Sequence, residues 1–139
     1  MASTATPILA VSAIVRRGTR FLLVQRGRPP IKGMYAFPGG RVDAGETLEA
    51  AALRELREET DLIGKNPQLY RVYDLPSAVT GETEHESFRL SAFIVEVDGN
   101  QAPAAGDDAA NVGWYTADEA RALPIPESVR ECIEDLASA

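Results

Sequence analysis

Apolar and polar residues alternate in short runs along most of the chain, and this period of two is typical of β-strands. The strands predicted by the pattern span residues 8–16, 20–26, 35–37, 41–42, 68–75, 86–97 and 112–115. Arg17-Gly18-Thr19 separates the first two strands, which predicts a β-hairpin. The small, acidic stretch 102–110 is predicted to be a loop.

Residues 48–60 follow a helical period instead. Thr47 precedes this stretch as a good N-cap, and Glu49 in the first turn suits the positive end of the helix dipole. Two further helices are expected near the C-terminus. Residues 116–119 form the capping-box pattern that starts a short helix, and Pro126 suits the first turn of a terminal helix.

Three carboxylates in the first predicted helix, Glu55, Glu58 and Glu59, stand at i, i+3 and i+4 and therefore share one face. Like charges so placed destabilise an isolated helix by about 0.2–0.5 kcal/mol per pair. On a wheel of about 100° per residue, Glu59 falls inside the apolar arc and the other two flank it. A solvated acidic face is the ordinary alternative. The wheel counts against it, because a carboxylate at the core edge is costly unless it is paired or binds a metal. The pattern favours a divalent cation.

Gly39-Gly40 follows Phe37-Pro38 and is predicted to form a turn before the acidic helix. Paired glycines let the backbone approach a ligand closely and offer it carbonyls or amides. The stretch is neither a Walker loop nor a dinucleotide fingerprint, because the required Lys-Ser/Thr ending and the G-x-G-x-x-G spacing are both missing.

Composition bounds the setting of this chemistry. The chain has 139 residues, which suits one domain over residues 1–139, and its net charge of −7 argues against nucleic acid as the main partner. The apolar runs are too short to span a membrane, and residues 1–7 lack the basic and apolar regions of a signal peptide. Cys132 is expected to be a packing residue, with no disulfide. A cytoplasmic location is expected.

Residues 40–62 resemble the Nudix box, G-x5-E-x7-R-E-U-x-E-E-x-G-U, in which U is a bulky aliphatic residue. The matching positions are Gly40, Glu46, Arg54, Glu55, Leu56, Glu58, Glu59 and Leu62. Asp61 stands where the family has glycine. This departure concerns helix termination, because Asp can adopt the left-handed conformation at a cost on the order of 1 kcal/mol. The resemblance implies an α/β fold, the Nudix-type α/β/α sandwich with a mixed central β-sheet.

The resemblance also implies hydrolysis of a nucleoside diphosphate linked to a group X, with Mg²⁺ or Mn²⁺ as cofactor. Glu58 and Glu59 are then the central metal ligands, and Glu55 supports them. A carbonyl of Gly39 or Gly40 adds a ligand, Arg54 holds a helix carboxylate, and Glu46 steadies the loop–helix junction. The metal reverses the sign of the site, polarises phosphoryl oxygens and lowers the pKa of the attacking water.

Residues outside the box have weaker signals. Arg26 and Lys32 could meet substrate phosphates or be solvated loop charges, and Arg28 is a lesser candidate. Tyr35 could stack on a base, as could Phe37 and Trp114, for which core packing is at least as good an interpretation. Positional similarity to the family suggests Asp108 as a further metal ligand or general base. Its competitors are Asp107, Glu82, Glu84 and Glu86, with His85 as a proton shuttle less favoured.

The expected partner is a small-molecule nucleotide, and the first choice is ADP-ribose or a related nucleotide sugar. Pro76 lies 14 residues after Leu62, close to a proline associated with ADP-ribose enzymes. A MutT-like nucleoside triphosphate pyrophosphohydrolase is the alternative. A non-catalytic nucleotide sensor is less favoured because the box carboxylates are intact, and an acidic protein with a structural Mg²⁺ or Ca²⁺ site is a third option. Homodimers are frequent among similar proteins.

Overall fold

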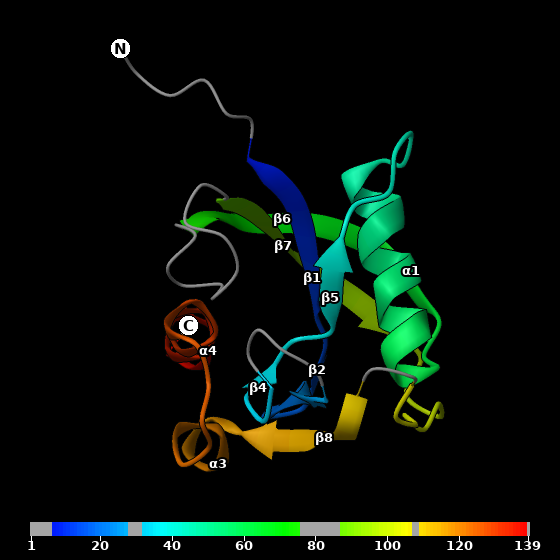
Figure 1. Cartoon of the computed structure of the whole chain (residues 1–139). Helices are drawn as coiled ribbons and strands as arrows, with labels where there is room; N and C mark the ends of the chain where they lie inside the picture. Colours follow the sequence, from blue (N-terminus) through cyan, green and yellow to red (C-terminus); the bar gives the residue numbers. More distant parts are fainter. Residues whose placement is uncertain (1–6, 28–31, 76–86, 107–108, 139) are drawn as a thin grey trace.

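The structure is a computed structural model that describes residues 7–27, 32–75, 87–106 and 109–138 (Figure 1). Its strands are β1 (Ile8–Ile14), β2 (Arg16–Arg17), β3 (Arg20–Arg26), β4 (Tyr35–Ala36), β5 (Gly39–Arg41), β6 (Gly64–Leu75), β7 (Phe88–Val97) and β8 (Ala109–Thr116). Its helices are α1 (Leu48–Thr60), α3 (Ala117–Arg121) and α4 (Glu127–Ala137). No helix among the described residues is long and apolar enough to cross a membrane.

The central sheet is mixed, as predicted, and has the strand order β5-β1-β7-β6. β1 pairs in parallel with β7 along its whole length, while β5 and β6 are added in antiparallel fashion at the two edges. A second, antiparallel sheet forms around β3, which pairs with β2, β4 and β8. The alternation pattern predicted the strands but gave no sign that they divide between two sheets.

The hairpin predicted between residues 8–16 and 20–26 is wrong over most of its length. β1 pairs with β5 and β7, and only the two residues of β2 fold back onto β3. The reason is burial: every residue from Ala10 to Val15 is buried, so this segment forms an interior strand of the mixed sheet. A strand covered on both faces needs neighbours on both edges, and these come from distant parts of the chain.

Helices cover both faces of the central sheet (Figure 1). Ala52 and Leu56 of α1 pack in one core cluster with Phe93, whereas Ile133 of α4 packs in the other with Ala92. Adjacent residues of a strand point to opposite faces, so α1 and α4 lie on opposite sides of β7. This arrangement confirms the α/β/α sandwich.

The helix ends follow the sequence signals with one exception. The Thr47 side chain accepts a hydrogen bond from the Ala50 amide at 3.1 Å, and Thr116 and Glu119 form the predicted capping box. Asp61 adopts the left-handed conformation with φ 63°, as expected at the family's glycine position. Pro126 is the N-cap of α4 and therefore precedes the first turn in which it was predicted to lie.

Candidate active site

The glycine pair predicted to form a turn lies in the edge strand β5, which corrects the prediction. β5 pairs with β1 in the register Val11 to Gly40 and Ser12 to Gly39. A side chain would prevent this pairing, because a Cβ on Gly39 would lie 2.2 Å from the carbonyl oxygen of Val11. Glycine is therefore needed here for close strand packing, and the backbone of β5 approaches the site as an extended strand.

The ladder between β1 and β5 decides which glycine faces α1. The amide of Ala13 donates to the Pro38 carbonyl at 2.8 Å, and the amide of Val42 donates to the Leu9 carbonyl at 3.0 Å. In an antiparallel pair, alternate residues bond to the same neighbouring strand. Gly40 lies midway between Pro38 and Val42, so its backbone groups face β1.

The backbone amide and carbonyl groups of Gly39 and Arg41 consequently point away from β1, towards α1. The Gly39 amide donates to Glu59 Oε2 at 3.3 Å, and Arg54 Nη2 donates to the Arg41 carbonyl at 3.0 Å. The amide and carbonyl of one strand residue point to the same side. Of the two predicted backbone ligands, the geometry favours the Gly39 carbonyl over that of Gly40.

Glu59 is buried, with 8% of its surface exposed, as the helical wheel predicted. Burial is the main cause that raises the pKa of Glu59 to about 8, and a hydrogen bond with Glu55 and the charge of Glu55 add to it. Gly40 makes room for this pair, because a Cβ there would lie 2.5 Å from Glu55 Oε2. Two carboxyl groups thus meet at the edge of β5, and the Glu59 carboxyl group holds its proton more tightly than an exposed glutamate does.

Glu58 lies apart from this pair. Its side chain is 59% exposed, and its Oε1 accepts a hydrogen bond from Arg54 at 3.1 Å. Within the described part of the chain, no three acidic, histidine or cysteine side chains come close enough together to hold a metal ion. The structure therefore brings together Glu55 and Glu59 of the predicted ligand set, and turns Glu58 towards Arg54.

Arg54 connects the carboxylates of the site to the loop before α1. It donates to both carboxylate oxygens of Glu46, at 2.7 and 3.0 Å, and to Glu55 Oε2 at 3.0 Å. The Arg54 hydrogen bond, helped by the Asp43 amide, lowers the pKa of Glu46 to about 2. These carboxylates in turn raise the pKa of Arg54 above its ordinary value. Glu46 thus anchors the guanidinium at the loop–helix junction.

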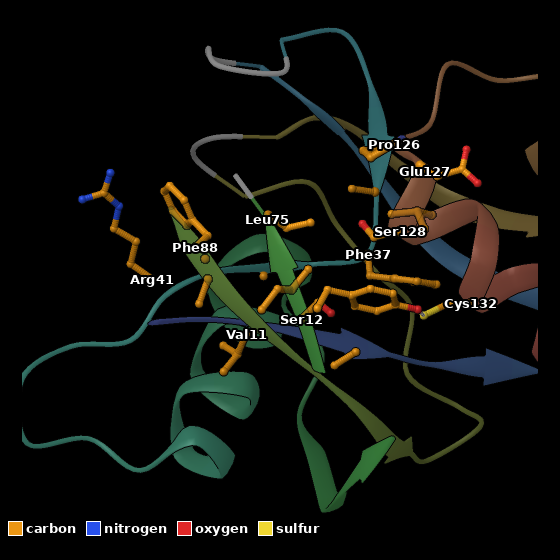
Figure 2. A pocket seen from close by; sticks show the side chains of 18 of the residues that line it. Val11, Ser12, Phe37, Arg41, Leu75, Phe88, Pro126, Glu127, Ser128 and Cys132 are labelled. Atoms are coloured by element: carbon orange, nitrogen blue, oxygen red, sulfur yellow. Dashed lines mark hydrogen bonds between the residues drawn. The ribbon is translucent and has the colours of Figure 1, made fainter. Parts of the chain in front are cut away.

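A pocket of about 400 Å³ opens on the α4 side of the central sheet, next to β5 (Figure 2). Arg41 and Phe88 lie at one end, and Cys132 with the start of α4 lies at the other. The lining is mostly apolar and includes Phe37 and the small residues of β1. Ser12 also lines it; Ser12 is only 7% exposed, and no described residue hydrogen-bonds to its hydroxyl.

The sequence did not single out Ser12, Phe88 or Ser128 as pocket residues, although all three line it. They come from β1, β7 and α4, which meet only in the folded chain. The only local signal was at Ser12, a polar residue within an otherwise apolar run. Cys132 is buried and free, as predicted, and its Sγ lies 3.0 Å from the Tyr73 hydroxyl.

The structure places the three predicted substrate-binding residues differently. Arg26 lines the pocket, its buried Nε has no hydrogen-bond partner among the described residues, and its charge opposes the rise in the pKa of Glu59. Lys32 is exposed and Tyr35 packs edge-on against Tyr115 at 5.6 Å, and the described pocket lining includes neither. Other predicted residues lie outside the described part of the chain, namely Arg28, Glu82, Glu84, His85, Glu86, Asp107 and Asp108.

Comparison with known proteins extends these observations. Residues 6–136 match the family model of the NUDIX domain. The chain is 38% identical over 110 residues to the ADP-ribose pyrophosphatase of Methanocaldococcus jannaschii, and the match covers 78% of this chain and 62% of that protein. This chain therefore spans less than two thirds of the length of that relative. It is 37% identical over 131 residues to a Mycobacterium tuberculosis protein named "Putative 8-oxo-dGTP diphosphatase 2", covering 93% and 87%.

The fold agrees with a solved structure as well. A MutT NUDIX hydrolase from Burkholderia pseudomallei superposes with a TM-score of 0.81 at 26% sequence identity. The superposition covers 94% of this chain and 98% of the other. The overall fold of this chain therefore matches that of a solved MutT NUDIX hydrolase.

Proposed function

The chain belongs to the NUDIX family, and from this membership we propose that it is a metal-dependent hydrolase of nucleotides. It cleaves the pyrophosphate linkage of a nucleoside diphosphate joined to a group X, by attack of water on phosphorus. The observation that carries the proposal is the pair of Glu55 and Glu59, held at the edge of β5 beside Gly39 and next to a pocket of about 400 Å³.

The donor set fits Mg²⁺ or Mn²⁺. The Glu55 and Glu59 carboxylates and the Gly39 carbonyl are all oxygen donors, which hard divalent cations prefer. A cation at this position would compete with the proton of Glu59 and would offset the cost of burying the Glu59 charge. Glu58 would join the ligands by leaving Arg54. When bound, the ion supplies positive charge that polarises the phosphoryl group and activates water.

Other side chains bind the substrate, support the metal ligands or take part in the proton transfer. Arg26 lies at the border between the pocket and the carboxylate pair, where its guanidinium can pair with a phosphate oxygen. Arg54 holds Glu55 in place for metal binding. Lys32, from its exposed loop, is a further candidate for the phosphates, and Tyr35 for the base. Asp108 is kept as the proposed general base or additional metal ligand.

The substrate class that we favour is ADP-ribose or a related nucleotide sugar. The name of the M. jannaschii relative supports this choice, and the mostly apolar pocket suits a nucleoside with a few polar contacts. A nucleoside triphosphate is the alternative, and the name of the M. tuberculosis relative favours it. A small-molecule partner, a cytoplasmic location and a homodimer remain part of the proposal.

A nucleotide panel with Mg²⁺, followed by product analysis, tests this function. We expect release of a nucleoside monophosphate, and loss of turnover in Glu58→Gln and in Glu59→Gln. Glu49→Gln is the matched control, because Glu49 is an exposed carboxylate in the first turn of the same helix. If wild-type protein bound nucleotide without hydrolysing any member of the panel, the proposed hydrolase function would be refuted and a nucleotide-sensing function would be favoured.

A further inference from the structure

The C-terminal turn of α1 is capped by a loop that is distant in sequence. The last four carbonyls of a helix have no partner within the helix. Here the Thr60 carbonyl accepts from the Ala104 amide at 2.8 Å, and the Glu59 carbonyl accepts from the Gly106 amide at 2.9 Å. We call residues 98–106 the capping loop. It stabilises the turn from which two of the acidic side chains project.

Gly106 lies against this turn more closely than any other residue type could. A Cβ at this position would lie 1.9 Å from the carbonyl oxygen of Glu58 and 3.0 Å from the Cα of Glu59. Both are backbone atoms, so neither can rotate away as a side chain would. Gly106 does not have a positive φ. Close approach to the helix is therefore the reason for glycine here.

A second anchor ties the capping loop to the end of the helix. The Gln101 side chain accepts from the Ile63 amide at 2.9 Å and donates to the Ile63 carbonyl at 3.2 Å. Arg17 donates to the Gln101 carbonyl at 3.1 Å while its guanidinium stacks over Trp114 at 4.4 Å. The loop thus has contacts with the end of α1 and with the second sheet, and Gly106 makes the closest approach.

We propose that Gly106 is a positioning residue for the carboxylate site. By capping the last turn of α1 it fixes how far the Glu59 carboxylate reaches towards β5, where Glu59 accepts the Gly39 amide at 3.3 Å. A misplacement of about 1 Å can lower a rate on the order of 100-fold. The inference rests on the proposed function and deepens it, because Gly106 acts through Glu58 and Glu59 and need not contact the metal or the substrate.

The test compares Gly106→Ala with Gly99→Ala. Both glycines are in the capping loop, but a Cβ on Gly99 would meet nothing within 4 Å. Binding of Mn²⁺ alone is measured by electron paramagnetic resonance on full-length, folded protein, well below its unfolding temperature. We expect Gly106→Ala to lower Mn²⁺ affinity and kcat each by at least 10-fold with little change in nucleotide KM. Gly99→Ala should match wild type.

A purely structural role would lower the unfolding temperature of Gly106→Ala and leave the Mn²⁺ affinity of the folded protein unchanged. That result overturns the inference. If Gly106→Ala does not fold, Gln101→Ala decides, because it releases the other anchor without placing an atom against α1. It should lower Mn²⁺ affinity in the same direction, and wild-type affinity in this variant would refute the proposal.

Metal binding also separates this inference from the function on which it rests. Wild-type protein that binds Mn²⁺ but hydrolyses no nucleotide would refute the hydrolase and leave the comparison of affinities intact. Equal Mn²⁺ affinities in an active wild type and an active Gly106→Ala protein would refute the positioning role alone. Amide hydrogen exchange across residues 56–63 gives the structural readout, which should be faster in Gly106→Ala than in Gly99→Ala.

Discussion

Glu59 is subject to opposite demands from stability and from metal binding. Its carboxyl group is buried against the sheet edge, and burial raises its pKa to about 8. In the metal-free protein the native state therefore holds this proton more tightly than the unfolded chain, in which the pKa is near 4.5. The energy that ionisation costs the native state is what a divalent cation would offset.

The first prediction follows from the sign of this shift. A raised pKa contributes stability that is fully present below pH 4.5 and is lost as the pH rises through about 8. Glu59→Gln keeps the shape and removes the ionisation. Each pKa unit corresponds to about 1.4 kcal/mol, so at pH 9 this variant should be more stable than metal-free wild type by a few kcal/mol.

Urea unfolding with a chelator present, at pH 4.5 and at pH 9, measures this difference. Glu49→Gln serves as the control, because it makes the same chemical change on an exposed part of α1. The advantage of Glu59→Gln should be much smaller at pH 4.5, where wild-type Glu59 keeps its proton. A stability difference that is the same at both pH values would show that ionisation of Glu59 is not the cause.

At the residue scale the sequence was most informative where the signal is local. The helical period placed Glu59 at the core edge, and the structure buries it. Arg26 could not be ranked above Lys32 from the sequence, because both are basic residues near the same loop. Only the fold shows that Arg26 lines the pocket while Lys32 is exposed. Whether a basic residue lines the pocket depends on contacts between segments that are distant in the sequence.

At the element scale, the C-cap residue that follows α1 has a backbone conformation that its residue type does not prefer. Asp61 is the C-cap, with φ 63° and ψ 13°, and its amide donates to the Arg57 carbonyl at 2.8 Å. Glycine adopts this left-handed region without a steric cost, whereas aspartate adopts it with some strain. The helix therefore terminates where the family pattern predicts, with a less suitable residue.

The second prediction concerns this cap. Asp61→Gly should stabilise the protein by up to about 1 kcal/mol, because it removes the left-handed strain. Asp61→Ala should destabilise it by about 1 kcal/mol, because the left-handed region is more costly for alanine than for aspartate. Thermal unfolding ranks the three proteins. Asp61→Asn is the charge control, and if it matched Asp61→Gly the gain would come from removing a negative charge at the helix C-terminus.

The predicted elements were correct more often than their pairings. The capping signals at Thr47 and Thr116 depend on three or four neighbouring residues, and both caps are present. The predicted hairpin failed because the same alternation fits a strand that turns back and a strand that enters a different sheet. Burial of β1 on both faces decided between these, and it depends on β5, β7 and both helical layers.

At the scale of the whole molecule, one sheet separates two kinds of environment. On one face, α1 carries the acidic residues to the edge strand β5. On the other, α4 and the aromatic residues around it enclose the pocket (Figure 2). A nucleotide whose phosphates meet the carboxylate site and whose nucleoside enters the pocket must pass the edge at β5. Because Gly39 and Gly40 have no side chains, no side-chain atoms of these two residues obstruct this edge.

The last prediction uses two buried serines that point to opposite faces of this sheet. Ser12 lines the pocket and is 7% exposed, whereas Ser91 is 4% exposed and, by strand alternation, shares the α1 face with Phe93. The Ser12 hydroxyl has no hydrogen-bond partner among the described residues, so it is available to a bound nucleoside. A net hydrogen bond contributes about 0.5–1.5 kcal/mol, so Ser12→Ala should weaken nucleoside monophosphate binding about 2- to 10-fold.

Calorimetric titration with a nucleoside monophosphate and chelator measures this effect without any metal ion. Ser91→Ala is the matched control, because it removes the same hydroxyl from a buried position on the opposite face and should bind as wild type does. Equal losses in both variants would indicate a general loosening of the central sheet. Wild-type affinity in Ser12→Ala would show that the nucleoside does not contact Ser12, and would place the nucleoside elsewhere in the pocket or outside it.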